Sequence, residues 1–341
     1  MFRSLVVISC VGLLVAPMNA ETPRLDVIGE VVRLDPAVDA LVPKDAKIEM
    51  LAEGFEWSEG PVWVNEMGGF LLFSDVPKNV VHQWSETGGL RAWLKPSGYT
   101  GRESRGGETG SNGLTLDAAG RLILCQHGDR RVARLDAPWS KPESRFVTIA
   151  DQFDGKRFNS PNDLVFHSSG ALYFTDPPYG MVGKFEDPKR ETDYLGVYRV
   201  GTDGNVALLT DQRTAPNGIA FSPDEQTLYV AQSDPQAPHI YAYDVQSDGS
   251  VQNERVFFDA TQLLKTSRGL PDGLKLDQAG NLFATGPGGV LVISPAGEHL
   301  GTISTGQLVA NCAFGDDGKT LYMTSDMCLA RIRLSTTGVG F

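Results

Sequence analysis

The chain has 341 residues and a formal net charge of -12. This acidic balance argues against a nucleic-acid partner, because binding there depends on Lys and Arg neutralising phosphates. Hydrophobic residues make up 41% of the chain, enough for a packed core, while 38 Gly and 20 Pro indicate a fold with many tight turns.

The first twenty residues differ from the rest of the chain. Arg3 is their one charged residue, and an apolar run from Leu5 to Ala16 follows it. This pattern predicts a secretory signal peptide over residues 1–20, with cleavage after Ala20. The run is short for an uncleaved membrane anchor. We therefore expect a periplasmic or secreted protein that has no membrane association after cleavage.

From residue 51 onward, one motif recurs six times. Each copy reads as a small polar head residue, an alternating strand, a turn with Gly or Asp, and a second strand, which is typical of a β-hairpin. Further strand patterns such as 196–200 and 240–245 bring each unit to about four strands. The head residues are Glu59, Asn112, Asn162, Asn217, Asp272 and Asn311. Successive heads are 53, 50, 55, 55 and 39 residues apart. Units of this kind predict an all-β, six-bladed β-propeller over residues 51–341.

Segments outside the motif carry their own expectations. Residues 21–50 contain the strand pattern Val31-Val-Arg-Leu and are expected to supply an outer strand to the last blade, closing the ring. Arg102 to Gly110, rich in Gly and charge, predicts a mobile loop over one face. Cys125, Cys312 and Cys328 lack metal-ligand spacing, and we expect buried thiols, with a Cys312–Cys328 bridge as the alternative.

The heads predict a central metal site. The innermost strand of each blade runs along the channel, so heads at one position in every blade converge at one level. Their Glu, Asp and Asn oxygens suit a hard cation such as Ca²⁺, while the lack of His and Cys disfavours a zinc cage. The predicted ligands are Glu59, Asn162, Asn217 and Asp272. Asn112 and Asn311 are expected to line the pocket. For any single head the alternative is a turn-forming Asn that only caps its strand.

Two other side chains are candidates for substrate binding. His127 follows the second strand of its blade, where we expect it to reach the pocket rim; the alternative is a His satisfied by loop backbone. Tyr179, with Asp176, lies in a Pro-rich turn at a strand end and is expected to border the mouth; the alternative is a buried aromatic in a rigid turn. The sequence has no G-x-S-x-G elbow and no P-loop, which disfavours a serine hydrolase and a nucleotide phosphate site.

Five motifs in order resemble the gluconolactonase/regucalcin/luciferin-regenerating-enzyme family, across roughly residues 51–334. They are Glu59-Gly-Pro-Val-Trp, Asn159-Ser-Pro-Asn-Asp-Leu, Thr175-Asp-Pro-Pro-Tyr-Gly, Pro216-Asn-Gly-Ile-Ala-Phe-Ser and Leu270-Pro-Asp-Gly-Leu. The resemblance implies a six-bladed propeller with one catalytic divalent metal, usually Ca²⁺ and in some members Zn²⁺.

Matched residue by residue, the resemblance implies that Glu59, Asn217 and Asp272 are metal ligands and that Asn162 contacts substrate or metal. It also implies that Asp272 acts in catalysis, either as general base or as nucleophile. The substrate-contacting Arg of the regucalcin branch has no clear counterpart, since Arg157 is offset from its place. The implied activity is hydrolysis of a sugar lactone such as gluconolactone. The alternatives are a hydrolase for other lactones, aryl esters or organophosphates, and a calcium-binding propeller without turnover.

Overall fold

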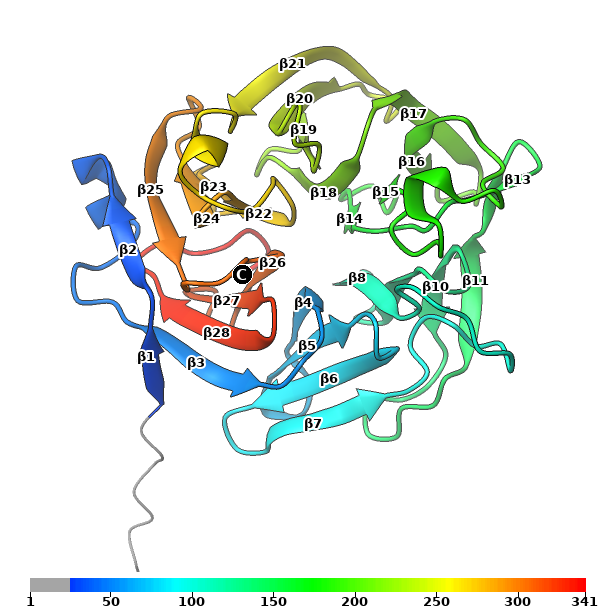
Figure 1. The fold of residues 1–341 in the computed structure, drawn as a ribbon, viewed down its shortest axis with the longest axis horizontal. Helices are drawn as coiled ribbons and strands as arrows, with labels where there is room; N and C mark the ends of the chain where they lie inside the picture. The colour runs from blue at the N-terminus through cyan, green and yellow to red at the C-terminus, as the bar shows by residue number, and fades with distance from the viewer. Residues whose placement is uncertain (1–24) are drawn as a thin grey trace, which may run out of the picture.

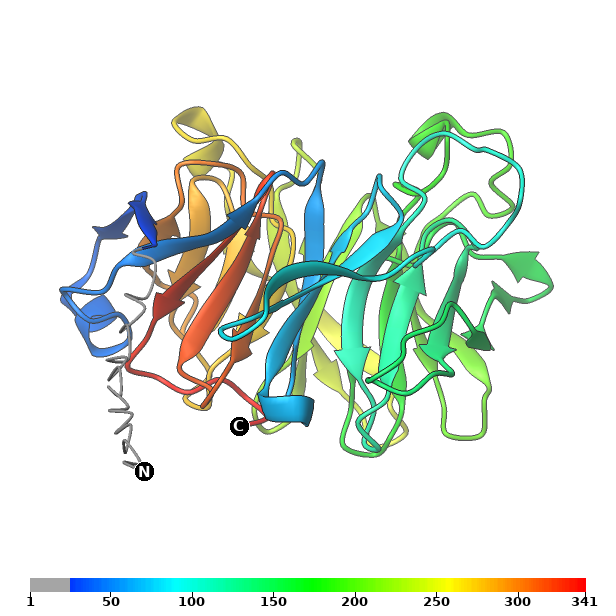
Figure 2. The ribbon, with the colours of Figure 1, turned by 90° about the horizontal axis from the view of Figure 1, so that it is seen from below.

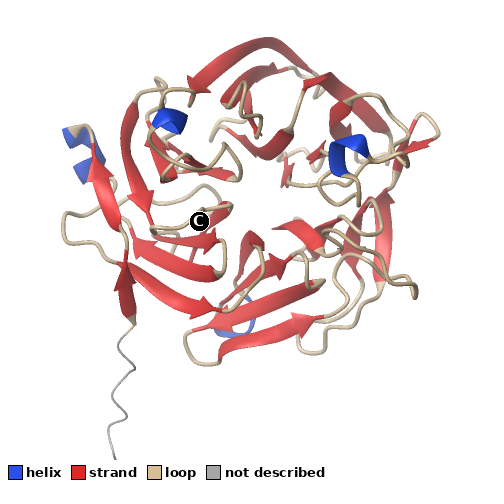
Figure 3. Cartoon of the chain, viewed as in Figure 1, coloured by secondary structure: helices blue, strands red, loops and turns tan. Residues whose placement is uncertain are grey.

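The strands form six antiparallel sheets arranged as blades around a central channel (Figures 1 and 3). The computed structural model describes residues 25–341, so the predicted signal peptide, residues 1–20, lies outside the described residues. The first strand of each blade contacts the first strands of both neighbouring blades, which places these six strands around the channel. The predicted all-β, six-bladed propeller is confirmed.

Each blade contains four consecutive antiparallel strands or their equivalent. The strands of blades one to three are β4 (Ser58–Val64), β5 (Phe70–Asp75), β6 (Val80–Ser85), β7 (Gly89–Leu94), β8 (Ser111–Leu116), β9 (Leu122–Gln126), β10 (Arg131–Leu135), β11 (Phe146–Ala150), β14 (Leu164–Phe166), β15 (Leu172–Asp176), β16 (Leu195–Val200) and β17 (Val206–Arg213). Those of blades four to six are β18 (Pro216–Phe221), β19 (Thr227–Gln232), β20 (His239–Val245), β21 (Val251–Asp259), β22 (Leu274–Leu276), β23 (Leu282–Gly286), β24 (Gly289–Ile293), β25 (His299–Ser304), β26 (Asn311–Gly315), β27 (Thr320–Ser325) and β28 (Cys328–Arg333).

The N-terminal segment supplies the missing fourth strand of blade six. This strand is β3 (Ile48–Glu53), which pairs with β28, and β1 (Asp26–Ile28) extends the same sheet beyond it. The Val31 pattern lies elsewhere, in β2 (Glu30–Arg33), which adds a fifth strand to blade five by pairing with β25. Val31 packs there against the core between blades five and six, which explains why this part of the segment joins the neighbouring sheet.

A hydrophobic cluster fills each of the six interfaces between neighbouring blades. Alternation along a strand serves two of these clusters at once, because successive side chains point to opposite faces of a sheet. In β9, for example, Leu122 and Leu124 pack toward blade one, while Ile123 and Cys125 pack toward blade three. The ring is therefore held together by face-to-face packing of its blades.

The interface between blades six and one closes the ring and has the smallest cluster. Aromatic rings dominate it: Tyr322 stacks on Trp63 with centroids 5.6 Å apart and an interplanar angle of 15°. Phe55 and Phe73 meet edge to face at 4.9 Å in the same cluster. Leu329 on β28 is fully buried among these rings.

The remaining elements are short. They are η1 (Pro36–Ala40), η2 (Glu66–Gly68), η3 (Lys184–Glu186), η4 (Leu263–Lys265) and the β12 (Gln152–Phe153) and β13 (Lys156–Arg157) hairpin. Within residues 25–341, no helix has the length and apolar character needed to cross a bilayer. Cys125, Cys312 and Cys328 are all buried free thiols, and Cys312 and Cys328 form no bridge. Figure 2 shows the loops that carry η3 and η4 on one face of the disc and the C-terminus on the other.

Truncation of Leu329 is expected to weaken ring closure. Leu329→Ala removes buried methyl groups from the smallest interface and should lower the free energy of unfolding by about 2–5 kcal/mol. The matched control is Val256→Ala on the outer strand β21, where the side chain is 49% exposed, and a change within about 0.5 kcal/mol is expected. Urea unfolding followed by tryptophan fluorescence measures both. Equal shifts for the two variants would contradict the assigned role of the interface.

Candidate active site

The six heads lie at the start of the inner strands, on the face that carries η3 and η4. Glu59, Asn112, Asn162, Asn217 and Asn311 are buried, and Asp272 is partly exposed. A small residue follows most heads and lets neighbouring inner strands approach closely. A Cβ at Gly60 would lie 2.1 Å from the Asn112 carbonyl oxygen, and one at Gly218 would lie 2.2 Å from that of Asp272. Glycine at these positions therefore brings the heads together.

A chain of side-chain hydrogen bonds joins three of the heads. Asn112 Nδ2 donates to Asn162 Oδ1 at 2.9 Å, and Asn162 Nδ2 donates to Asn217 Oδ1 at 2.5 Å. Asn217 Nδ2 continues the chain to Ser233 Oγ at 2.9 Å. On the other side, Asn311 Nδ2 donates to Glu59 Oε2 at 3.3 Å. Each amide is thus fixed in orientation by its neighbours.

The heads form the floor of a cavity of about 650 Å³. This volume is within the range of small-molecule sites, roughly 300–1,000 Å³. Five heads line the cavity, while Asn311 lies behind Glu59 and does not line it. The polar lining residues are Glu59, Glu108, Asn112, Asn162, Tyr179, Asn217, Ser233, Ser267, Arg268 and Asp272. The apolar side chains that line it are Trp57, Pro235, Leu264, Leu270, Leu308, Val309 and Ala310.

Both floor carboxylates have raised pKa values. Burial raises the pKa of Glu59 from its ordinary 4.5 to about 8. A hydrogen bond donated by Gly60 N at 3.0 Å acts in the opposite direction and partly offsets this rise. Burial also raises the pKa of Asp272 well above its usual range, and the Glu59 charge adds to that effect. Asp272 Oδ1 is buried and has no hydrogen-bond partner. Without a compensating positive charge, the pair therefore holds protons near neutral pH.

The residues present fit a hard divalent cation. Two carboxylates share the floor with Asn162 and Asn217, the Asp272 oxygen lacks a partner, and a bound cation would offset the Glu59 charge that acts on Asp272. Across the described residues, no group of three His, Cys, Asp or Glu is placed to hold a metal. The donor set thus relies on Asn oxygens, which suits Ca²⁺ better than Zn²⁺.

His127 lies behind the floor instead of at the rim. Its side chain is fully buried and does not line the cavity, because Asn162 stands in front of it and Gly180 packs on its Cβ. His127 Nε2 lies 3.3 Å from Asn162 Oδ1, and Nδ1 lies 3.6 Å from the Glu108 carboxylate. Burial lowers the pKa of His127 to about 3, so the ring is neutral. It orients Asn162 and is not itself exposed to a ligand.

Tyr179 lines the cavity, as expected, and its hydroxyl is buried without a partner. Burial, with the nearby Asp272 charge, raises its pKa, so the hydroxyl keeps its proton. The turn that carries it is rigid because Asp176 accepts hydrogen bonds from Asn159 N at 2.7 Å and Ser160 N at 2.8 Å. Asp176 is thus a positioning residue for both Asn162 and Tyr179.

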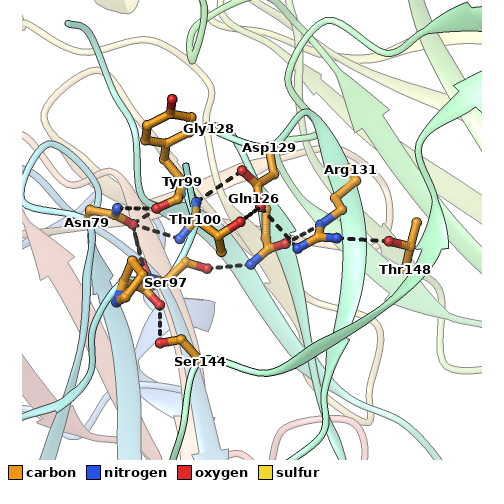
Figure 4. A network of polar contacts seen from close by, with 12 residues as sticks. Asn79, Ser97, Tyr99, Thr100, Gln126, Gly128, Asp129, Arg131, Ser144 and Thr148 are labelled. Atoms are coloured by element: carbon orange, nitrogen blue, oxygen red, sulfur yellow. Dashed lines mark hydrogen bonds and ion pairs between the residues drawn. The ribbon is translucent and has the colours of Figure 1, made fainter. Parts of the chain in front are cut away.

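Glu108 reaches the cavity from the loop that was expected to be mobile. The start of this loop is anchored by a polar network in which Thr100 N donates to Asp129 Oδ1 at 3.0 Å and Gln126 Nε2 donates to the Ser97 carbonyl at 2.7 Å (Figure 4). Further along, Arg105 donates to the Gly128 carbonyl at 2.6 Å. Lys184 Nζ lies 3.1 Å from Glu108 Oε1 and partly offsets its charge. Glycine and charge marked this loop, but the sequence did not show that Glu108 points inward.

Sequence reasoning also missed Asp163 and Ser233. Asp163 follows the head Asn162, at a position where four other blades have Gly, and its buried Oδ2 has no partner. Its departure from the repeat was a visible signal. Ser233 follows β19 with no distinguishing pattern. Arg157 lies on the exposed β13 and does not line the cavity, which agrees with its offset in the sequence.

Comparison with known proteins gives consistent relatives. Residues 57–327 match the SMP-30/Gluconolactonase/LRE-like region family. The chain is 41% identical over 327 residues to a gluconolactonase of Zymomonas mobilis, an alignment that covers 94% of this chain and 89% of the relative. It is 25% identical over 278 residues to human regucalcin, covering 79% of this chain and 83% of the relative.

Solved structures agree. A gluconolactonase from Xanthomonas campestris superposes with a TM-score of 0.78 and 31% identity, covering 93% of this chain and 99% of that chain. The matched family region contains all six heads, and the fold is shared over nearly the whole length of the chain. The chain therefore belongs to the SMP-30/Gluconolactonase/LRE-like family.

Proposed function

We propose that this chain hydrolyses sugar lactones such as gluconolactone, with Asp272 as the catalytic base and a divalent cation, Ca²⁺, held by Glu59, Asn162, Asn217 and Asp272. The observation that carries the proposal is the partnerless Asp272 oxygen beside Glu59 at the floor of a lactone-sized cavity. Family membership and the gluconolactonases named above support the substrate class. A regucalcin of Agrobacterium tumefaciens described as calcium-binding supports the choice of cation.

The chain's own residues divide the chemistry among them. The Asp272 carboxylate accepts a proton from the attacking water, whose oxygen adds to the lactone carbonyl carbon. The ring C–O bond then breaks, and the leaving alkoxide takes the proton back from Asp272, giving a hydroxy acid. Tyr179, with its buried free hydroxyl, donates to a substrate oxygen. A bound divalent cation would supply Lewis-acid stabilisation of the negative charge that develops on the carbonyl oxygen.

The Asn network keeps this geometry fixed. Asn162 is held by Asn112, Asn217 and His127, so its amide cannot rotate without breaking several contacts. Such pre-organisation reduces the free-energy cost of reaching the reactive arrangement.

The predicted export of the protein remains a proposal that rests on residues 1–20, and it places the reaction in the periplasm or outside the cell.

Removal of the base is expected to abolish turnover. Asp272→Asn should lower kcat for glucono-δ-lactone by about 100-fold or more, since general acid–base groups typically contribute about 10²–10⁴. A pH-stat assay of the mature protein, with chelator and then with added Ca²⁺, measures this beside the wild type. Chelation should stop the wild-type reaction and Ca²⁺ should restore it. Rates that do not change on chelation would refute the metal dependence of the reaction. Absence of any lactone turnover would refute the proposed lactonase function.

Isotope labelling distinguishes the base from a nucleophile. With enzyme in molar excess over lactone in H₂¹⁸O, attack by water places one ¹⁸O in the carboxylate during the first turnover. If Asp272 instead attacked the carbonyl carbon and water then opened the resulting mixed anhydride at the Asp272 carboxyl carbon, the first turnover would transfer an unlabelled oxygen from that carboxylate. Mass spectrometry of the product after a single turnover reads this directly. We expect label in the first product molecule, and its absence there would assign Asp272 as nucleophile.

The raised carboxyl pKa values predict a pH-dependent stability of the metal-free protein. The Glu59 pKa is about 8 in the folded protein against 4.5 as its ordinary value, so the folded state binds more protons between these pH values. Stability of chelated protein should therefore fall as pH rises from about 4.5 to 8, and the raised pKa of Asp272 acts in the same direction. Saturating Ca²⁺ should remove the fall, because it binds the deprotonated carboxylates.

Thermal unfolding between pH 5 and 9, with chelator and with Ca²⁺, measures this effect. The gap between the two melting temperatures should widen with pH. Glu59→Gln is the control, because it removes one titrating carboxyl and should narrow the gap. A gap that is independent of pH in the wild type would contradict the coupling of these carboxyls to metal binding.

A further inference from the structure

The cavity above the heads is chemically two-sided. Loops of blades two to four supply polar groups, including Glu108, Asn162 and Ser233. The loops that precede the inner strands of blades five, six and one supply a continuous apolar wall instead. We define the apolar wall as Trp57, Leu264, Leu270, Leu308 and Val309. The polar neighbours on that side are Ser267 and Arg268, of which Arg268 is exposed.

The apolar wall is held in place by its own backbone. Trp57 O accepts a hydrogen bond from Val76 N at 3.1 Å, and the Leu308 carbonyl accepts one from Ser325 Oγ at 3.1 Å. The η4 turn is closed by Ser267 N donating to Leu263 O at 2.9 Å, and Leu263 packs into the core between blades four and five. Because the backbone of the wall is already fixed, a ligand that binds against it does not have to order these loops and loses no binding free energy in doing so.

Such a wall suits a substituent that carries no hydroxyl groups. Burying apolar surface is worth about 0.8 kcal/mol per methylene, or about fourfold in affinity. A sugar hydroxyl pressed against Leu264 or Leu308 would lose water and find no partner, which is unfavourable. The floor polarises one end of a lactone, and the apolar wall covers the other.

Resting on the proposed lactonase function, we propose that the site also opens lactones that carry an alkyl substituent on the ring carbon bonded to the ring oxygen, and that it favours longer alkyl chains among them. The lactone carbonyl faces Asp272 and Glu59, and the alkyl chain lies along Leu264, Leu308 and Trp57. Fully hydroxylated sugar lactones share the floor contacts but leave the apolar wall unused. Trp57, Leu264 and Leu308 are then specificity-determining residues.

The test is a chain-length series on the metal-loaded mature protein. δ-Hexalactone, δ-octalactone and δ-decalactone carry methyl, propyl and pentyl groups where glucono-δ-lactone carries a hydroxymethyl group. We expect kcat/KM to rise about fourfold for each added methylene that the wall covers. A flat or falling series, with glucono-δ-lactone still opened, overturns this inference alone. If no lactone at all is opened, the proposed function fails, and calorimetric binding of the same series then tests the apolar wall by itself.

Substitutions in the apolar wall test whether these side chains cause the preference for longer alkyl chains. Leu308→Asn and Leu264→Gln keep similar size but make the wall polar, and each should lower the δ-decalactone to glucono-δ-lactone ratio of kcat/KM by about tenfold. Leu308→Met keeps the wall apolar and should preserve the δ-decalactone to glucono-δ-lactone ratio of kcat/KM. If Leu308→Asn folds poorly, Leu264→Gln still tests the polar change and Leu308→Met serves as its apolar comparison. The matched control, Leu90→Gln on the outer strand β7, lies outside the cavity and should change neither substrate. Equal losses on both substrates for the wall variants would refute the assignment.

Discussion

The structure depends on the close approach of six inner strands around one axis. Their backbones come near enough that a Cβ at Gly60, Gly113 or Gly218 would overlap a neighbouring carbonyl oxygen or its chain. This proximity requires glycine after four of the heads, and it forces the head side chains into one layer. The hydrophobic clusters between the blades hold the strands at that distance. Packing between blades and polar convergence at the centre are therefore consequences of the same geometry.

That geometry has an electrostatic cost. Glu59 and Asp272 are brought into one layer, where burial raises the pKa of both and the Glu59 charge further disfavours the ionised form of Asp272. Asp163, buried one residue past a head, adds a further negative charge that acts on both. A protein that only needed a stable ring would have no use for three carboxyl groups there. The strain in this layer is relieved by protons or by a cation, and it is the physical basis of a reactive centre.

The sequence predicted the fold because the repeat is local and strongly patterned. Alternating strands and turn residues recur with each blade, and convergence of the heads follows from symmetry alone. What could not be predicted depends on contacts between distant loops. His127 is hidden because Gly180, from the next blade, packs against it, and Glu108 points inward because its loop is pinned to blade three. Neither contact has a signature in the sequence around the residue itself. The Val31 pattern was expected in the strand that closes the ring, but β3 occupies that place. The outer edges of blades five and six are both available to the N-terminal segment, and the sequence does not show which strand joins which edge.

Ring closure also determines when the centre is completed during folding. β3 pairs with β28, so Glu53 meets Cys328 across a separation of 328 − 53 = 275 residues. Glu59 follows β3 by only a few residues, which ties its final position to the last strands of the ring to be synthesised. Pairing over such a distance forms slowly, because a large loop entropy must be overcome first. A chain that stops short of blade six leaves β3 without its partner. Activity in this fold is thus a property of the finished ring, and an incomplete chain would be expected to lack a formed centre even with most of its heads present.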